Sequence, residues 1–167
     1  MPSVSRTLFV PILLAPMLLA SAAGLAQQPQ PPKAAPPYGP PITLAEAKKI
    51  ARAAEDAARR AGALSDVIAI VQPDGFLVYF EKFDRATYVS IEFAQAKART
   101  AAITRMPTGG FGPNSSPPPL PSLIGLPGGL PIVIDGRTVG AIGVSGTESV
   151  PGWNDVRIAE AGLTALK

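Results

Sequence analysis

The sequence predicts one α+β domain in which helices pack against a single antiparallel sheet. Two Asp-Gly pairs, Asp74-Gly75 and Asp135-Gly136, each separate two runs rich in strand-forming residues, which strongly indicates a β-hairpin. Three alanine-rich segments with helical periodicity alternate with these hairpins. Because tight hairpins make neighbouring strands antiparallel, the order α-ββ-α-loop-ββ-α predicts one sheet of four or five strands with flanking helices.

The first helical segment begins with a capping box. Thr43 and Glu46 have the spacing at which each side chain can bond the other's backbone N–H group. Gly62 provides a natural end to this helix. Its apolar side consists mostly of alanine, so we expect it to pack closely against a flat surface such as a sheet.

The other elements follow from similar patterns. Strands are expected in 67–72 and 76–83, and again on either side of the second Asp-Gly turn, in 131–134 and 137–146. A second helix is predicted over Ser90–Arg105, with Ser90 as its cap, and a third over Trp153–Lys167, with Asn154 as its cap. The turn-forming stretch 109–121 between the second helix and the second hairpin is long enough for a lid, a ligand-binding loop or disorder.

Glycines are concentrated around the second hairpin, but they match no nucleotide-binding motif. Gly140 and Gly143 are an odd number of residues apart on one strand and therefore face opposite sides of the sheet. One is expected to admit an alanine-rich helix, and the other a ligand or a neighbouring subunit, although packing alone explains both. Gly128 and Gly129 precede the strand, where their N–H groups could form an anion-binding concavity or simply a flexible loop entry.

The N-terminus resembles an export signal followed by a spacer. Arg6 precedes the apolar run 8–20 and a set of small residues, which predicts a signal peptide over residues 1–26. Residues 27–41 contain seven prolines and predict a disordered linker. The domain would then span residues 42–167, periplasmic or secreted, with no membrane span after the leader is cleaved. An uncleaved N-terminal anchor is the alternative.

Composition excludes several classes of function. The chain contains no cysteine and no histidine, which rules out zinc–thiolate and iron–sulfur sites and every catalytic triad that uses histidine. The net charge of +3 comes from scattered residues, so no nucleic-acid-binding face is expected. The sequence contains no close cluster of acidic residues, so it does not predict a metal site.

Lys97 is the most notable cation, because it lies within the second helical segment among small residues. Its ammonium could bind a carboxylate, or act as a base if desolvated, while a solvated lysine is the ordinary alternative. Thr100 and Thr108 could add hydroxyl contacts to a ligand, or bond only within the helix. Asp155 is expected to begin the third helix. The conventional haem ligands besides lysine are Tyr79, Tyr88 and Met106.

Four blocks of sequence together resemble the GlcG/HbpS-like haem-binding family, which includes the C-terminal domain of PduO-type proteins. They are ITLAEAKKIARAAEDAARRAG, VQPDGFLVYFEKFD, AQAKARTAAITRMPT and GGLPIVIDGRTVGAIGVSG with the following Asp155. The last block is the most specific. The resemblance implies a profilin-like single domain, homo-oligomers, and relatives that include exported haem-binding proteins. The missing histidine argues against a His-ligated haem, so Thr108, a tyrosine or a lysine would have to replace it, and the proline-rich loop 113–121 departs from the family pattern.

Two functions remain open at this point, with a binding protein favoured over an enzyme. The first is an exported protein that binds haem or a related tetrapyrrole, with Lys97, Thr100, Thr108, Gly128 and Gly129 at the site and Lys97 bonded to a propionate. The alternative is a cofactor-free isomerase or tautomerase acting on a small organic acid, in which Lys97 or Asp155 moves the proton. An oligomeric scaffold without a ligand is the third reading.

Overall fold

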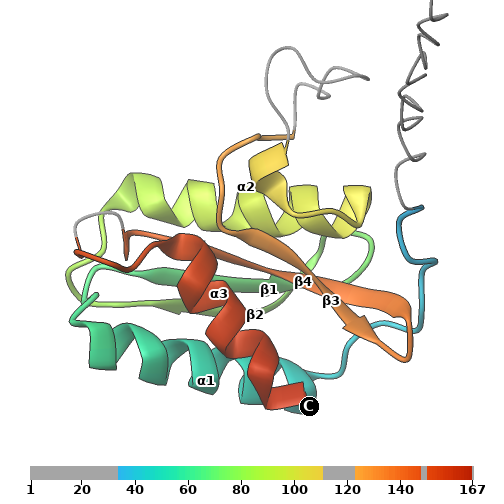
Figure 1. The fold of residues 1–167 in the computed structure, drawn as a ribbon, viewed down its shortest axis with the longest axis horizontal. Coiled ribbons are helices and arrows are strands. Elements are labelled where there is room, and N and C mark those ends of the chain that lie inside the picture. Colours follow the sequence, from blue (N-terminus) through green and yellow to red (C-terminus); the bar gives the residue numbers. More distant parts are fainter. Residues whose placement is uncertain (1–33, 111–122, 148–149, 167) are drawn as a thin grey trace, which may run out of the picture. The chain divides into compact units, whose positions relative to one another are not determined.

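A four-stranded antiparallel sheet, in the order β2-β1-β4-β3, lies at the centre of the domain (Figure 1). The computed structural model describes residues 34–110, 123–147 and 150–166. The predicted α+β class and element order are confirmed, and the elements are α1 (Leu44–Ala61), β1 (Val67–Val71), β2 (Leu77–Lys82), α2 (Tyr88–Thr104), the 3-10 turn η1 (Thr108–Gly110), β3 (Gly129–Ile134), β4 (Arg137–Ser145), α3 (Asp155–Leu163) and the 3-10 turn η3 (Thr164–Leu166).

Both predicted hairpins are present. β1 pairs with β2 and also with β4, and β4 pairs with β3. In the second hairpin, Asp135 and Gly136 both have positive φ, 49° and 72°, which is the conformation that favours an Asp-Gly pair between two strands. In the first hairpin, the Asp74 carboxylate accepts a hydrogen bond of 3.0 Å from the Phe76 N–H group. Turn chemistry therefore sets the register of both hairpins.

The sheet is covered on both faces, by α2 on one side and by α1 and α3 on the other (Figure 1). Side chains of β1 alternate between two cores: Ile68 and Ile70 pack with the α1 and α3 layer, and Val67, Ala69 and Val71 pack with α2. All five residues of β1 are buried, as expected for a strand with a helix on each face.

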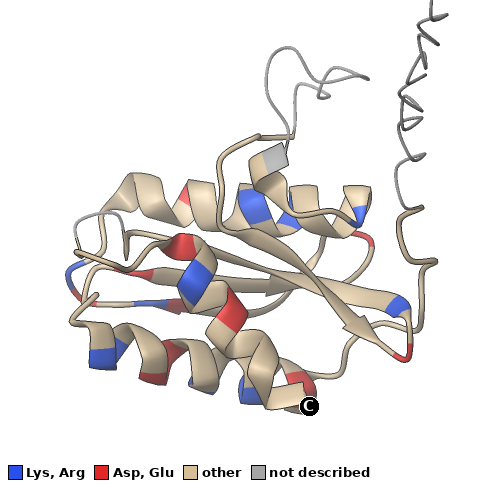
Figure 2. Cartoon of the chain, viewed as in Figure 1, with Lys and Arg blue, Asp and Glu red and all other residues tan. Residues whose placement is uncertain are grey.

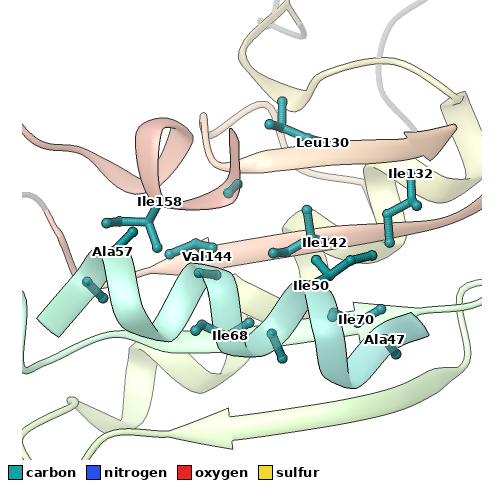
Figure 3. Packing of buried hydrophobic residues seen from close by; sticks show 14 of the residues in the cluster. Ala47, Ile50, Ala57, Ile68, Ile70, Leu130, Ile132, Ile142, Val144 and Ile158 are labelled. Carbon is teal, nitrogen blue, oxygen red and sulfur yellow. The ribbon is translucent and has the colours of Figure 1, made fainter. Parts of the chain in front are cut away.

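The larger core lies between the sheet and the α1 and α3 layer. Figure 3 shows aliphatic side chains of the strands meeting small residues of α1. The predicted capping box begins α1, and Gly62 ends it in the left-handed conformation with a φ of 78°. Alanine on the buried side of α1 allows the helix to lie close to the sheet.

Gly143 allows the same close approach on the opposite face. A Cβ atom at this position would collide with the Ala94 carbonyl oxygen and would lie 2.5 Å from the Ala98 amide nitrogen. Gly140 points to the other face, where its hypothetical Cβ would meet the Val71 carbonyl oxygen and Ile42. The prediction of opposite faces is confirmed, and within this chain both glycines are explained by packing.

Helix α2 begins two residues earlier than the predicted Ser90. Thr87 occupies the N-cap position, and its hydroxyl lies 2.9 Å from the Ser90 hydroxyl inside the first turn. Ser90 as the cap is therefore wrong. The Asn154 cap of α3 is confirmed, because its side chain accepts a hydrogen bond from the Arg157 N–H group.

The end of the predicted linker is bound to the domain. Gly39 donates to the Thr138 carbonyl, Thr138 donates to the Pro37 carbonyl, and the Tyr38 hydroxyl donates to the Ile103 carbonyl. The Arg105 guanidinium lies 4.7 Å from the centre of the Tyr38 ring. Residues 37–39 of the predicted linker therefore supply backbone hydrogen-bond partners to β4. The predicted signal peptide 1–26 and residues 27–33 lie outside the described residues.

Charged residues of both signs are interspersed on the helices (Figure 2). On α1, for example, Glu55 and Asp56 lie between Arg52 and Arg59. None of the helices in the described ranges is long and apolar enough to cross a membrane.

Candidate functional site

A lysine and an aspartate form a buried ion pair at one end of the sheet. The Lys97 Nζ atom lies 2.6 Å from Asp155 Oδ2, and the two side chains are 2% and 5% exposed. Lys97 also donates a hydrogen bond of 3.0 Å to the Val144 carbonyl. The predicted candidate residues Lys97 and Asp155 therefore meet, and the solvated alternative for Lys97 is wrong.

Local sequence explains how these two side chains reach each other. Lys97 lies on the side of α2 that faces the sheet, between the buried Ala94 and Ala101. Asp155 is the first residue of α3 and follows the Asn154 cap. Gly128 leaves the necessary space: a Cβ there would lie 2.7 Å from the Asp155 Cβ atom and 3.2 Å from Lys97 Nζ, and its φ of 118° also favours glycine.

A second buried carboxylate, Asp66, joins this pair through Thr147. The Thr147 N–H group donates to Asp155 Oδ1 at 2.9 Å, and the Thr147 hydroxyl lies 2.9 Å from both carboxylate oxygens of Asp66. Asp66 and Thr147 are fully buried. Lys97, Asp155, Thr147 and Asp66 therefore form one continuous buried network, which joins α2, α3, the end of β4 and the start of β1.

Burial raises the pKa of the Asp66 carboxyl from 3.8 to about 7. The hydrogen bond from Thr147 opposes this increase in the pKa, the nearby charge of Asp155 adds to it, and the charge of Lys97 opposes it. Asp66 is therefore a carboxyl whose protonation changes near neutral pH.

A pocket of about 240 Å³ opens beside the network between α2 and the end of β4. Lys97 is the only charged residue in its lining among the described residues, and Val89, Phe93 and Leu126 provide apolar surface. Among the described residues, the lining consists of Thr87, Val89, Ser90, Phe93, Lys97, Leu126, Ser145 and Gly146. A smaller hollow of about 90 Å³, lined by Pro127, Asn154, Asp155 and Val156, adjoins the Asp155 end of the ion pair.

One N–H donor of Lys97 remains for a ligand. An ammonium has three such donors, and within the described residues only the Val144 carbonyl and Asp155 Oδ2 accept hydrogen bonds from it. Because Lys97 also lines the 240 Å³ pocket, its third donor can serve an anionic or carbonyl group bound there.

Thr100 and Thr108 fasten the chain segment that leads into β3. The Thr100 hydroxyl accepts a hydrogen bond of 3.0 Å from the Ile124 N–H group. The Thr108 hydroxyl donates to the Leu126 carbonyl at 2.5 Å and accepts from the Gly129 N–H group at 3.0 Å. Both threonines thus hold the backbone around Leu126, which is part of the pocket wall.

Gly128 and Gly129 are buried rather than exposed at a loop entry, and Gly129 is already the first residue of β3. The Gly128 carbonyl accepts from the Val144 N–H group, and a Cβ at Gly129 would collide with the Lys97 carbonyl oxygen. In this structure the two glycines bring the backbone against α2 and the ion pair.

Tyr79, Tyr88 and Met106, the other conventional haem ligands, are not among the described residues that line the pocket. The Tyr79 hydroxyl donates to Glu81 at 2.7 Å, and this hydrogen bond raises the pKa of Tyr79 to about 12. Tyr88 and Met106 are exposed. Within the described ranges, no three carboxylates are close enough together to hold a metal ion.

A second hollow, of about 290 Å³, lies beside the end of β2, and two of its cations, Arg59 and Lys82, already have partners. Arg59 is paired with Glu55 at 2.7 Å, and Lys82 donates to the Phe83 carbonyl. The pocket at Lys97 is therefore the better candidate.

Sequence reasoning missed Asp66 and Thr147. The visible indication is an acid, Asp66, directly before the buried run VIAIV, where a charged residue needs a polar partner. Its partner Thr147 is 81 residues away in the chain, so sequence spacing could not identify the pair.

Comparisons with known proteins agree with this architecture. A family model described as "Haem degrading protein HbpS-like" matches residues 42–164. Protein GlcG of Escherichia coli K12 is 35% identical over 83 residues, which cover 47% of this chain and 62% of GlcG. The aligned part therefore spans less than two thirds of the length of GlcG.

Solved structures show the same fold. The crystal structure of HbpS has a TM-score of 0.67 and 33% identity, with 77% of this chain and 92% of that chain covered. The crystal structure of a PduOC:haem complex has a TM-score of 0.65 and 23% identity, with 76% and 96% covered. At that identity the second likeness concerns the fold alone.

Proposed function

The chain belongs to the HbpS-like family, and on this premise we propose that it binds haem or a related tetrapyrrole at the pocket beside Lys97. The family description names haem degradation, and the related PduOC was crystallised with haem. Binding is the step that any haem chemistry requires, and it is the step for which this chain offers a site.

The observation that carries the proposal is the placement of one cation in a pocket whose other described lining residues are uncharged. Val89, Phe93 and Leu126 are 54%, 37% and 47% exposed, so they offer apolar surface to a ligand. The Lys97 ammonium lies deeper, beside Asp155. A tetrapyrrole combines a flat apolar ring with carboxylates at its edge, and this combination matches the pocket.

The volume and the polar groups of the pocket limit how haem could bind there. A volume of about 240 Å³ is below the roughly 300–1,000 Å³ of sites that enclose drug-sized ligands, so the pocket admits one edge of the ring. The remaining ring would lie on the exposed apolar rim. For the iron, the described lining residues offer the hydroxyls of Thr87, Ser90 and Ser145, while Lys97 is already hydrogen-bonded to Val144 and Asp155. The residues fit the ring and a propionate, and besides Lys97 the described lining residues supply no conventional axial ligand.

A haemin titration tests the proposal. Wild-type protein should give a saturable change in the Soret band at micromolar haemin, and iron-free protoporphyrin should compete, because the ring and its carboxylates make the contacts. Lys97→Met would leave Asp155 as an unpaired buried charge, so the charge-balanced variant Lys97→Met/Asp155→Asn is the better test. It should weaken binding at least about tenfold, as expected for one lost charge-assisted hydrogen bond.

Lys48→Met provides the matched control, because Lys48 is an exposed lysine on α1. This variant should bind haemin like the wild type. If the wild type shows no saturable change, or if the charge-balanced variant binds as tightly as the control, the proposal is wrong.

We also propose that the protein is exported and forms homo-oligomers. The apolar run 8–20 followed by small residues supports export. N-terminal sequencing of protein recovered from cell fractions should find a periplasmic or secreted chain that begins at residue 27. Light scattering of this mature form should give a mass that is a multiple of the monomer.

A second candidate function is an isomerase or tautomerase acting on a small organic acid. The position of Lys97 favours it, because this lysine both lines the pocket and is bonded to Asp155, so the pocket holds a cation next to a proton-accepting group. Exchange of α-protons of small keto acids with deuterated water, followed by NMR, tests it. Exchange by the wild type that is lost in Lys97→Met/Asp155→Asn would support an enzyme.

A further inference from the structure

The buried network contains two carboxylates and only one cation. Asp66 and Asp155 are 0% and 4% exposed, and Lys97 is 2% exposed. With every group ionised, the network carries one uncompensated negative charge, which is costly in a buried position. A proton on either carboxylate would make the network neutral.

Asp66 is the better place for that proton. Asp155 bonds directly to the Lys97 ammonium and accepts the Thr147 N–H group, so its ionised form has two charge-stabilising partners. Among the described residues, the Asp66 carboxyl has only the Thr147 hydroxyl, which carries a single hydrogen for two carboxylate oxygens. A protonated Asp66 can instead donate to the Thr147 oxygen, so the contact remains in both states.

The charged surroundings of Asp66 lead to the same conclusion. Asp155 of α3 and Lys97 of α2 are the charged groups that act on it, and burial is the largest influence, holding its pKa at about 7. On β2, the neighbouring Lys82 ammonium donates to the Phe83 carbonyl rather than to Asp66.

The wall of the pocket connects Asp66 to the ligand position. Gly146 lines the pocket, and a Cβ on Gly146 would lie 3.0 Å from the Asp66 Cα atom. Asp66 therefore lies directly behind the pocket wall without touching a ligand, and it acts on the ligand position through Thr147, Asp155 and Lys97.

We propose that this pocket takes a carboxylate-bearing ligand together with one proton, and that Asp66 is the residue that receives the proton. The inference rests on the proposed function and adds to it, since it names the carboxylate as the recognised group and Asp66 as a positioning residue. A ligand carboxylate at the third donor of Lys97 brings a further negative charge to a network that already has an excess. Protonation of Asp66 removes that excess, so binding and protonation favour each other.

The consequence is a pH-dependent affinity with a defined sign. Above the pH at which Asp66 loses its proton in the free protein, each bound ligand must bring a proton with it. The affinity then falls as the pH rises, by up to about tenfold per pH unit.

Haemin and benzoate are the two probes, titrated at pH 6.5, 7.5 and 8.5 into the wild type, Asp66→Asn and Asp56→Asn. Asparagine imitates the protonated carboxyl, so Asp66→Asn should bind about as tightly as the wild type at pH 6.5 and more tightly than the wild type at pH 8.5. Asp56 is an exposed acid on α1, and its variant should follow the wild type. Any pH dependence of haemin itself is common to all three proteins and cancels in the comparison.

Infrared difference spectra of the wild type at pH 8.5 give a second readout that needs no variant. Addition of ligand should produce the absorption of a protonated buried carboxyl. If Asp66→Asn keeps the pH dependence of the wild type, or if no such absorption appears on binding, the inference is wrong. If benzoate binds with a pH dependence that Asp66→Asn removes, and haemin does not bind, the proposal of haem binding is wrong. The coupling between carboxylate binding and protonation of Asp66 is then still supported. If neither probe binds, both are wrong.

Discussion

The Lys97 ammonium lies 2.6 Å from the Asp155 carboxylate and joins α2 to the first residue of α3 at the wall of the candidate pocket. The two residues are 58 positions apart in the chain, and both are almost completely buried. A buried pair of this kind is costly to break on one side, because the remaining charge loses its partner.

Removing one charge of the pair should destabilise the fold more than removing both. Lys97→Met or Asp155→Asn alone should lower the free energy of unfolding by about 3–5 kcal/mol. Lys97→Met/Asp155→Asn should cost less than the sum of the two single changes, because neither charge is then left alone. Urea unfolding of the four proteins in a double-mutant cycle measures the difference.

The surface pair of Glu55 and Arg59 on α1 is a suitable comparison, since Arg59 is 56% exposed. The same cycle there should show little coupling. If the two cycles gave equal coupling energies, burial would not be the reason for the strong coupling expected between Lys97 and Asp155.

Asp66→Asn should flatten the dependence of stability on pH. The folded-state pKa of Asp66, about 7, lies above its ordinary value of 3.8. The unfolded chain therefore releases this proton at lower pH than the folded protein. The stabilisation associated with Asp66 is complete below about pH 4 and is lost as the pH rises to about 7, by at most about 1.4 kcal/mol per pH unit.

Thermal unfolding of the wild type and Asp66→Asn from pH 4 to pH 8 measures this effect as the difference between their free energies of unfolding. The variant should gain stability relative to the wild type as the pH rises through this interval, and the difference should stay constant above about pH 7. A constant difference across the whole interval would show that Asp66 titrates at its ordinary pKa.

Gly143→Ala should separate α2 from the sheet. The new methyl group would collide with the backbone of α2 at Ala94 and Ala98, and backbone atoms cannot move aside as a flexible side chain can. Such overpacking costs about 1–3 kcal/mol, and more where the backbone must move. At Gly109, where the nearest atom is 3.5 Å away in Pro127, the same change should be tolerated. Unfolding midpoints of the two variants measure the difference.

The parts of the fold that local chemistry controls could be predicted from the sequence. The capping box of Thr43 and Glu46, the left-handed Gly62 and both Asp-Gly turns depend on residues only a few positions apart. The start of α2 was predicted less well, because the N-cap residue Thr87 makes no side-chain capping hydrogen bond and its hydroxyl lies beside that of Ser90, the predicted cap.

The candidate site could be predicted only in part, because its contacts connect distant segments. Lys97 and Asp155 were each identifiable by residue type, but nothing local indicates that they pair. Asp66 meets Thr147 across 81 residues, and only the folded sheet brings the start of β1 beside the end of β4. The pairing of Val67 with Ser145 in the sheet places Asp66 and Thr147 at the same end.

Substitutions of Thr108 can distinguish a structural role of its hydroxyl from a ligand-binding role. Its hydroxyl holds both the Leu126 carbonyl and the Gly129 N–H group, and Thr108 is fully buried. Thr108→Val leaves both backbone groups without this partner, at a cost of about 1–3 kcal/mol for each buried group left unsatisfied. It should also weaken haemin binding, because Leu126 in the pocket wall is no longer held.

Thr108→Ser keeps the hydroxyl and should restore both stability and affinity. Thr104→Val provides the control, since that hydroxyl bonds back to the Thr100 carbonyl on α2 and is half-buried. Urea unfolding combined with haemin titration measures both properties on the same samples. If Thr108→Val lost affinity at unchanged stability, its hydroxyl would act on the ligand directly, and the structural role given to it here would be wrong.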